Sequence, residues 1–289
     1  MSIVVEQTFG GNWLVPPPLS GVREFGVPTG GAFDPVAAEC ARLLSGASEG
    51  TTVLELVAPV VLRAQDDLIV GLADAGEPFA VDERKLTGPG RLVLRSGSKL
   101  ELPAPRLAYR RYVCWSGLRC HSKLPVPLTE GASLYSQTLA GRARSFKLAE
   151  QIVPDDRLSL RIVTDHTISR DEFIVSPQMN RAGIRLSGAI EGQPALGLSE
   201  PSVLGAVQVT PSGELLIHGP DGPTIGGYPK IGVIAQADLR RVSYLRPGDR
   251  ARLIPISIAH ALNLLTDLEE TKRRLVGSIQ LAISTSAVD

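Results

Sequence analysis

The chain has 289 residues, of which 43% are hydrophobic and 21% charged, and 30 basic residues balance 30 acidic ones. This composition excludes a disordered chain and predicts one large domain or two of about 140 residues each. A net charge of zero argues against a nucleic-acid partner or an anionic membrane surface bound through bulk electrostatics. No stretch approaches the roughly 18 unbroken apolar residues of a membrane span, the N-terminus lacks a basic leader region, and the cysteine count is odd. We therefore expect a cytoplasmic protein with reduced thiols.

Taken in chain order, the elements begin with a helix at 34–46, "DPVAAECARLLSG", where Asp34 is a candidate cap, Pro35 takes the first position and Gly46 ends it. Short Val-, Ile- and Leu-rich runs follow, from "TVLELVA" to "RARLIPI", with turn residues about every ten positions, which favours antiparallel barrels or sandwiches. Apolar residues at helical spacing predict a C-terminal amphipathic helix over 257–275. A connection at "QIVPDD" predicts two β domains, residues 1–155 and 156–289.

Several side chains are candidates for chemistry, each with a plainer explanation beside it. Cys114, Cys120 and His121 in "CWSGLRCH" suggest a metal, but no second ligand pair completes a tetrahedral site, so we expect none. Glu55 in "VLELV" either faces water or is a buried carboxylate. His218, at the end of "ELLIHG", either packs in the structure or serves the glycine-rich loop that follows it.

Charged residues and glycines supply the remaining candidates. Arg181 and Arg185 are four residues apart in "MNRAGIRLSG" and are either a bidentate anion clamp or an ion-paired strand edge. In "GPTIGGYPKIG", residues 222–232, Gly226 and Gly227 allow a ligand to approach the main chain, and Lys230 adds a cation. The alternative for this loop is a structural hairpin.

The segment "GPDGPTIGGYPKIGVIAQADLRRVSYLRPGDRARL" resembles a signature of the biotin-dependent carboxyltransferase-like family that includes the C subunit of 5-oxoprolinase and proteins like the second subunit of allophanate hydrolase. The matched positions are 224–231, 237–239 and 245–249. Similar segments lie in the family's order at "FGVPTGGAFD", "MNRAGIRLSG" and "VLGAVQVTPSG", the last of which retains Gln208. The chain has "VTDHT" where the family has Gly-Pro-Gln, and Asn180 where it has aspartate, as in a divergent member.

The resemblance implies two cyclophilin-like β barrels and a cytoplasmic, ATP-dependent complex, in which the chain and a partner like the B subunit of 5-oxoprolinase open a cyclic amide, 5-oxoproline. ATP is expected to be handled by or with the partner, and biotin is not expected on this chain, which lacks an Ala-Met-Lys-Met context. The implied site comprises Lys230, Arg185 and Asp34 as catalytic residues, with Gly226, Gly227, Tyr228, Gln208, Arg181 and Thr224 as substrate contacts. The alternatives are a non-catalytic module that sequesters a partner protein, and a urea- or allophanate-type amidohydrolase or carboxyltransferase component. A homo-oligomer is also compatible with the sequence.

Overall fold

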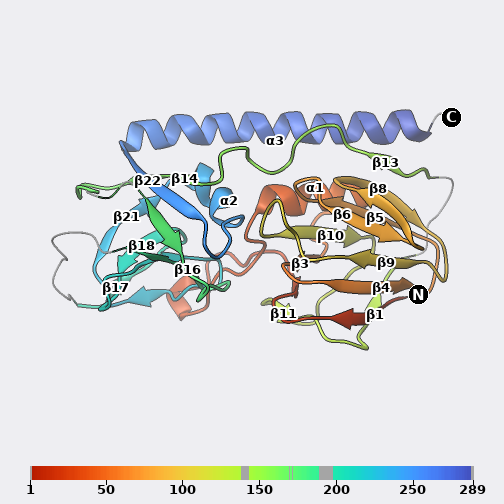
Figure 1. The fold of residues 1–289 in the computed structure, drawn as a ribbon, viewed down its shortest axis with the longest axis horizontal. Coiled ribbons are helices and arrows are strands. Elements are labelled where there is room, and N and C mark those ends of the chain that lie inside the picture. The colour runs from red at the N-terminus through yellow and green to blue at the C-terminus, as the bar shows by residue number, and fades with distance from the viewer. Residues whose placement is uncertain (1, 138–142, 169, 171, 189–197, 288–289) are drawn as a thin grey trace. The chain divides into compact units, whose positions relative to one another are not determined.

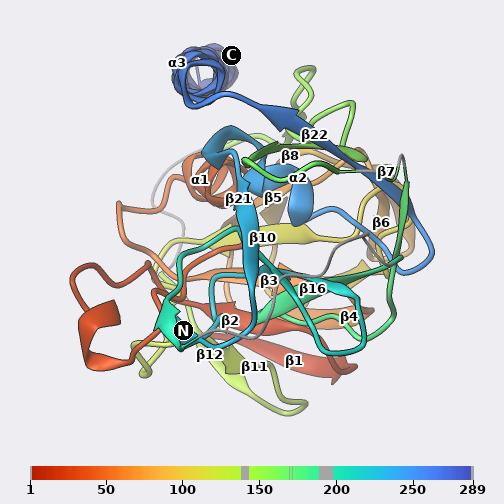
Figure 2. The same ribbon diagram turned by 90° about the vertical axis from the view of Figure 1, so that its left-hand side faces the viewer.

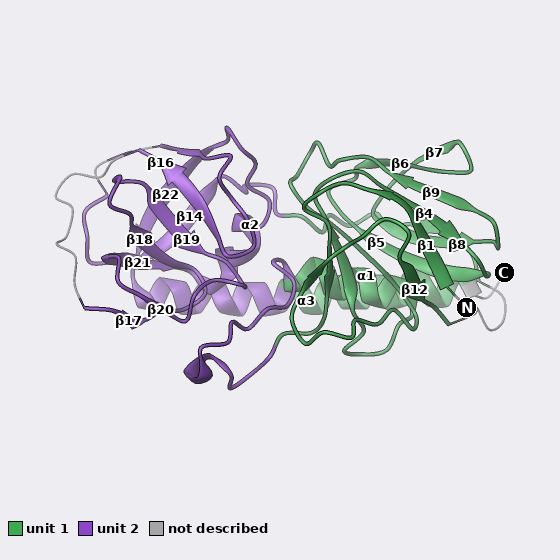
Figure 3. Cartoon of the chain, turned by 90° about the horizontal axis from the view of Figure 1, so that it is seen from below, with its two compact units in different colours: residues 1–18, 35–153, 271–289 green, residues 19–34, 154–270 purple. Residues whose placement is uncertain are grey.

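The computed structural model describes residues 2–137, 143–168, 170, 172–188 and 198–287, which form a mainly β protein with a long C-terminal helix (Figure 1). The expected fold class is therefore confirmed. The chain divides into two compact units (Figure 3): unit 1 holds residues 1–18, 35–153 and 271–289, and unit 2 holds residues 19–34 and 154–270. Each unit has a hydrophobic core of its own.

Unit 1 is built from two antiparallel sheets, with strand orders β12–β1–β4–β9–β6–β7 and β11–β2–β3–β10–β5–β8–β13. The strands are β1 (Ser2–Thr8), β2 (Trp13–Val15), β3 (Val53–Leu56), β4 (Val60–Ala64), β5 (Leu68–Ala73), β6 (Pro78–Val81), β7 (Arg84–Thr87), β8 (Gly90–Leu94), β9 (Lys99–Leu102), β10 (Arg111–Trp115), β11 (Val126–Pro127), β12 (Ser133–Tyr135) and β13 (Phe146–Lys147). Leucine, valine and isoleucine side chains from both sheets, together with Trp115, form one buried cluster. Alternation of apolar residues along the strands produces this arrangement, because successive side chains point to opposite faces.

Helix α1 (Pro35–Ser45) packs on this unit as its sequence predicts. Its buried side chains include Val36, Cys40 and Leu44, which share one face. Gly46 adopts a φ of 73°, the left-handed conformation with which glycine commonly ends a helix. On β5, Gly71 lies against the backbone of α1, where a Cβ atom would collide with the carbonyl oxygen of Ala41. The close approach of helix and strand therefore requires glycine at that position.

Unit 2 is a closed barrel with the strand order β14–β21–β18–β19–β16–β15–β22, sealed by parallel pairing of β14 with β22. Figure 2 labels β16 and β21 of this barrel, and β22, which leads toward α3. The elements are η1 (Arg23–Phe25), β14 (Ser159–Val163), β15 (Phe173–Val175), β16 (Gly183–Ser187), β17 (Glu200–Pro201), β18 (Ala206–Val209), β19 (Leu215–His218), β20 (Ile225–Gly226), β21 (Lys230–Ile234), η2 (Gln236–Asp238), α2 (Leu239–Val242) and β22 (Arg250–Ile256). Inward-facing residues of the barrel strands fill its core. The short strands β17 and β20 form a separate two-stranded ladder.

The C-terminal helix α3 (Ile258–Ala287) is longer than the sequence pattern indicates. The basic residues at 272–274, which suggest a helix end, lie well inside it, and the helix continues through Gly277. Glycine inside a helix costs about 1 kcal/mol relative to alanine. Leu275 and Ile279 on either side of it are buried. None of the described helices combines the length and the hydrophobicity that a membrane span requires.

Candidate functional site

A row of side chains crosses the outer face of the unit 2 barrel. Going from strand to strand, it consists of Arg185 on β16, Leu216 on β19, Gln208 on β18 and Lys230 on β21, each paired with the next. Directly paired residues of antiparallel strands project from the same side of a sheet, so these four side chains share one face. Three strand spacings of about 4.8 Å place the two ends of the row about 14 Å apart at the backbone. We call this face the outer face.

His218, also on β19, links the outer face to Ser202, the residue after β17, through a buried series of hydrogen bonds. Its Nε2 lies 2.9 Å from Gln208 Oε1, and its Nδ1 lies 2.8 Å from Ser202 Oγ. Burial lowers the pKa of His218, and the nearby cations Arg23 and Lys230 lower it further, so the ring is neutral at pH 7. Because an amide oxygen only accepts, Nε2 carries the proton and Nδ1 accepts from the Ser202 hydroxyl.

The Ser202–His218–Gln208 chain has the order of a nucleophile, a base and an orienting group, but its chemistry favours positioning. In an activated triad the third group is a carboxylate that stabilises the imidazolium ion. Here the third group is an uncharged amide, and the surrounding charges oppose protonation of His218. Ser202 is itself buried. The chain of hydrogen bonds therefore fixes β17 against the barrel and does not activate the serine.

The glycine-rich segment, residues 222–230, which we call the GGYPK loop, lies directly on Gln208. A Cβ atom at Gly226 would lie 2.6 Å from Gln208 Nε2. That nitrogen is buried and has no hydrogen-bond partner among the described residues. The loop is also paired with β17, since the amide of Ser202 donates to the carbonyl of Thr224 over 2.8 Å. A glycine at 226 is therefore what lets the loop close over the amide.

Lys230 is the cation at the end of the GGYPK loop. Its Nζ lies 2.9 Å from Glu200 Oε1 and donates to the carbonyl of Pro201 over 3.3 Å. The lysine side chain is 25% exposed and that of Glu200 is 49% exposed, so a ligand can reach both. Exposed pairs of this kind are worth only about 0.2–1 kcal/mol, so an incoming anion can displace Glu200 at little cost. Tyr228, on the same loop, is also exposed.

Arg23, far away in the sequence, holds the loop and β17 together. Its Nη2 donates to the carbonyl of Ser202 over 2.8 Å and to that of Pro223 over 3.0 Å. Gly227 has its nearest potential Cβ neighbour, the hydroxyl of Ser199, at 3.3 Å. Sequence reasoning identified neither Arg23 nor the β17 residues that contact the loop. The segment "SEPSV" at residues 199–203, which contains β17, has no recognisable motif. The residues that Arg23 contacts lie 179 and 200 positions away along the chain.

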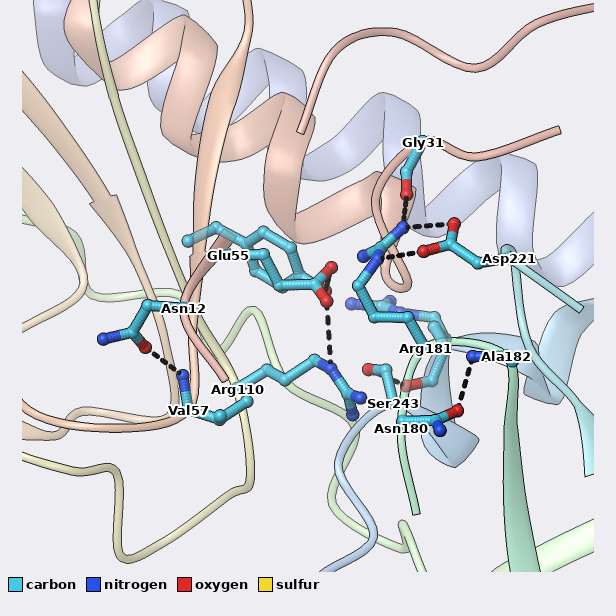
Figure 4. Close-up of polar contacts among 12 residues, drawn as sticks. Asn12, Gly31, Glu55, Val57, Arg110, Asn180, Arg181, Ala182, Asp221 and Ser243 are labelled. Atoms are coloured by element: carbon cyan, nitrogen blue, oxygen red, sulfur yellow. Dashed lines mark hydrogen bonds and ion pairs between the residues drawn. The ribbon is translucent and has the colours of Figure 1, made fainter. Parts of the chain in front are cut away.

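Arg181 acts at the start of the loop, as an ion pair and not as an open clamp (Figure 4). Its Nε and Nη2 bind the two carboxylate oxygens of Asp221 over 2.7 and 3.0 Å, and Nη2 also donates to the carbonyl of Gly31 over 2.6 Å. The Asn180 side chain accepts from the amide of Ala182 over 2.8 Å. These contacts fix the backbone that leads into the GGYPK loop.

Asp34 and Arg185 each form an ion pair with an oppositely charged residue of unit 2. Asp34 is fully buried, and its Oδ2 accepts from Tyr244 over 2.7 Å and from Arg240 over 3.2 Å. Arg185 is part-exposed on the outer face and contacts Glu214 over 3.4 Å. Lys230 thus lies close to Gln208 and the loop glycines, and Arg185 lies on the same face of the barrel. Asp34 is buried elsewhere in unit 2, in an ion pair with Arg240. The catalytic roles of these residues stay predictions.

Two candidates from the sequence lie in unit 1. Glu55 is buried, and it accepts from Arg110 Nε over 3.2 Å (Figure 4) and from the Tyr112 hydroxyl over 3.1 Å. Of the two interpretations of Glu55, the buried carboxylate is therefore correct. Cys114 is buried, whereas His121 is exposed. Among the described residues, no group of three or more His, Cys, Asp or Glu side chains is arranged to hold a metal ion.

The model of the carboxyltransferase domain, subdomains A and B, matches residues 25–124 and 154–255 of this chain. The chain therefore belongs to this family, as the resemblance of its motifs predicts.

Among curated relatives, the C subunit of the Haemophilus influenzae 5-oxoprolinase is 25% identical over 271 residues, which cover 84% of this chain and 88% of that protein. The C subunit of the Escherichia coli 5-oxoprolinase is 24% identical over 276 residues, 86% of this chain and 89% of the relative.

Solved structures show the same fold. A crystal structure of TTHA0988 matches 87% of this chain with a TM-score of 0.78 and 25% identity, and this chain spans 56% of the length of that protein. The urea carboxylase of Kluyveromyces lactis matches 96% of this chain with a TM-score of 0.78 and 18% identity, and this chain spans 29% of that enzyme. The second likeness concerns the fold alone.

Proposed function

We propose that this chain is the C-type component of an ATP-dependent 5-oxoprolinase, which hydrolyses a cyclic amide together with a B-type partner protein. The observation that carries the proposal is Lys230, a partly exposed cation on the GGYPK loop that is held by one exposed carboxylate and one carbonyl. The two relatives that cover most of the chain are both named as the C subunit of a 5-oxoprolinase, which supports the choice of substrate.

In this proposal a phosphoryl group passes from ATP to the exocyclic carbonyl oxygen of the lactam with release of ADP, water adds to the activated carbon, and the ring C–N bond breaks as its nitrogen takes a proton, which leaves an acyl phosphate. A second water molecule releases inorganic phosphate from this intermediate, and Lys230 stabilises the negative charge that develops on the carbonyl oxygen in that addition. An amide carbonyl is a poor electrophile, and transfer of a phosphoryl group from ATP to its oxygen would supply the activation. We assign ATP to the partner protein, because this chain has no P-loop sequence. The GGYPK loop would position the ring, and Arg185 on the outer face would bind the substrate carboxylate through its planar guanidinium.

The test is turnover of 5-oxoproline by the complex reconstituted with its partner. Lys230→Ala should lower kcat by about 10²–10³, the loss typical of removing one preorganised donor at a developing oxyanion. Arg185→Ala should mainly raise KM, because a carboxylate away from the reacting bond is bound equally in the ground and transition states. Lys123→Ala, which removes an exposed lysine of unit 1, is the matched control and should leave both constants unchanged.

A second candidate, a module that binds the partner without taking part in turnover, is favoured by the uncharged Ser202–His218–Gln208 chain, which lacks an activated nucleophile. The same experiment separates the two functions. If Lys230→Ala leaves turnover unchanged but the protein still binds its partner, the catalytic assignment fails and the binding module stands.

A further inference from the structure

The GGYPK loop supplies a cation for the carbonyl oxygen, but hydrolysis of the acyl phosphate also requires a base. Water is a weak nucleophile, and a positioned general base typically raises the rate by about 10²–10⁴. Lys230 cannot take this part, because an ammonium group that donates to the carbonyl oxygen has no acceptor for a further proton. A second side chain beside the loop is therefore needed to accept the proton of the attacking water.

Two titratable groups beside the GGYPK loop are held in structural contacts. His218 is buried, its Nε2 donates to Gln208 and its Nδ1 accepts from Ser202, so both ring nitrogens are engaged. Asp221 accepts from Nε and Nη2 of Arg181 through its two carboxylate oxygens. The histidine is inaccessible to water, and the aspartate faces a guanidinium group that binds both of its oxygens. Both groups therefore favour positioning over proton transfer.

Glu200 on β17 differs from these groups, because its carboxylate is exposed and lies on the catalytic cation of the proposal. Its side chain is 49% exposed, and its Oε1 lies 2.9 Å from Lys230 Nζ. The β17–β20 ladder, whose strands lie side by side in Figure 3, pairs Glu200 with Gly226 and Pro201 with Ile225. The backbone of Glu200 is thus fixed on the GGYPK loop itself. A carboxylate paired with a lysine is ionised, and so it can accept a proton.

Lys230 can bind a substrate oxygen while Glu200 stays beside it. A lysine ammonium group has three donors. Among the described residues, its partners are the carboxylate of Glu200 at 2.9 Å and the carbonyl of Pro201 at 3.3 Å. The third donor is available to the carbonyl oxygen of the substrate. Substrate, cation and carboxylate can therefore meet at one nitrogen atom.

The distances allow one water molecule to bridge Glu200 and the reacting carbon. A hydrogen bond of about 2.9 Å from Lys230 and a C=O bond of about 1.2 Å place the carbonyl carbon about 4 Å from Nζ. Glu200 Oε1 lies 2.9 Å from the same nitrogen, so this oxygen and the carbon are at most about 7 Å apart. A water molecule about 2.7 Å from the carboxylate and about 3–3.5 Å from the carbon spans about 6 Å. The span falls within this limit.

We propose that Glu200 is the general base of this hydrolysis, an inference that rests on the function proposed above. A proton of the water molecule passes to a carboxylate oxygen of Glu200 as the water oxygen bonds to the carbonyl carbon of the acyl phosphate. Lys230 holds the negative charge on the carbonyl oxygen. The bond from this carbon to the phosphate oxygen then breaks, and Glu200 returns the proton to the departing phosphate. The new carboxyl group loses its own proton to solvent, and Glu200 is again a carboxylate.

The experiment is turnover of 5-oxoproline by the complex of the full chain with its partner. In Glu200→Gln, the amide oxygen still accepts from Lys230 but cannot take up a proton, so kcat should fall at least about 10²-fold with little change in KM. Glu101→Gln is the matched control. It removes the carboxylate of another part-exposed lysine pair, in which Lys99 Nζ lies 2.5 Å from Glu101 Oε1, and it should leave both constants unchanged.

Two further readouts separate a base from a residue that only holds Lys230 in place. Phosphoryl transfer precedes the step assigned to Glu200, so the acyl phosphate should accumulate in Glu200→Gln. Hydroxylamine should trap it as glutamyl hydroxamate, in a larger amount per complex than in the unmodified protein, as measured by mass spectrometry. Formate should restore turnover to Glu200→Ala at least about tenfold, because it supplies the missing base, and should not restore it to Lys230→Ala.

Turnover by the unmodified complex distinguishes the failure of this inference from the failure of the proposed function. If the unmodified complex hydrolyses 5-oxoproline and a folded Glu200→Gln variant keeps its kcat, the assignment of the base is overturned while the function stands. The assignment is also overturned if kcat falls but neither hydroxamate accumulation nor rescue by formate is seen, since Glu200 then only positions Lys230. If the unmodified complex forms neither glutamate nor a trapped intermediate, the proposed function fails, and the base assignment fails with it.

Discussion

Replacing Gly226 by alanine tests how the GGYPK loop is held on the barrel. The added Cβ would lie 2.6 Å from Gln208 Nε2, 3.1 Å from Oε1 and 3.3 Å from Cδ. Ordinary van der Waals contact begins at 3.4 Å, so the shortfall is 3.4 − 2.6 = 0.8 Å. The φ of Gly226 lies outside the left-handed region, so alanine introduces no backbone strain there. The clash with Gln208 is therefore the perturbation.

The cost follows from how tightly Gln208 is held. Its oxygen accepts from His218 over 2.9 Å, and the side chain is buried, so it cannot swing into solvent. Either the loop rises off the barrel, or Gln208 gives up that hydrogen bond. Overpacking costs about 1–3 kcal/mol and a lost hydrogen bond about 0.5–1.5 kcal/mol. We expect the free energy of unfolding of unit 2 to fall by about 2 kcal/mol.

Urea unfolding, combined with native-state hydrogen exchange of the β18 and β19 amides, measures this cost for unit 2 alone. Gly227→Ala is the matched control, since its Cβ would meet only the flexible hydroxyl of Ser199 at 3.3 Å, and it should cost far less. In a Gln208→Ala background, Gly226→Ala should cost almost nothing. An equal cost in both backgrounds would show that the clash with Gln208 is not its source.

Three other predictions follow from buried groups. Burial lowers the pKa of His218 below its usual 6.5. The contribution of the neutral ring to the free energy of unfolding is therefore complete above pH 6.5 and is lost as the pH falls through the lowered pKa. His218→Asn should flatten the dependence of the unfolding free energy on pH below 6.5. Burial raises the pKa of Cys114 to about 12, so iodoacetamide at pH 8 should modify Cys120 and spare Cys114, as read by mass spectrometry, and rapid modification of Cys114 in the folded chain would contradict this. Asp74→Asn should lower the free energy of unfolding of unit 1 by about 3–5 kcal/mol, because it leaves the buried charge of Arg111 unpaired, and a loss below 1 kcal/mol in urea unfolding would contradict the importance of that pair.

The sequence alone determined the features that depend on neighbours along the chain. Helix α1 begins at Pro35 and stops before Gly46, as the sequence indicates, because the backbone preferences of proline and glycine act locally. Alternating strands with frequent turns indicated the mainly β class, since the period of two is a property of each strand. The adjacency of His218 to the glycine-rich loop was also visible, because only a few residues separate them.

Only the tertiary structure shows which charged side chains form ion pairs and which do not. Asp34 meets Arg240 across 206 residues, and Arg23 meets Pro223 across 200, so no local pattern could have indicated either contact. Helix α3 likewise continues past Gly277, between the buried side chains of Leu275 and Ile279, where the sequence pattern ends the helix at 275. Arg91 looks like any strand arginine in the sequence, and only the folded unit shows that it is buried without a carboxylate partner among the described residues. Pairing of charges depends on distance in space, which periodicity and composition do not encode.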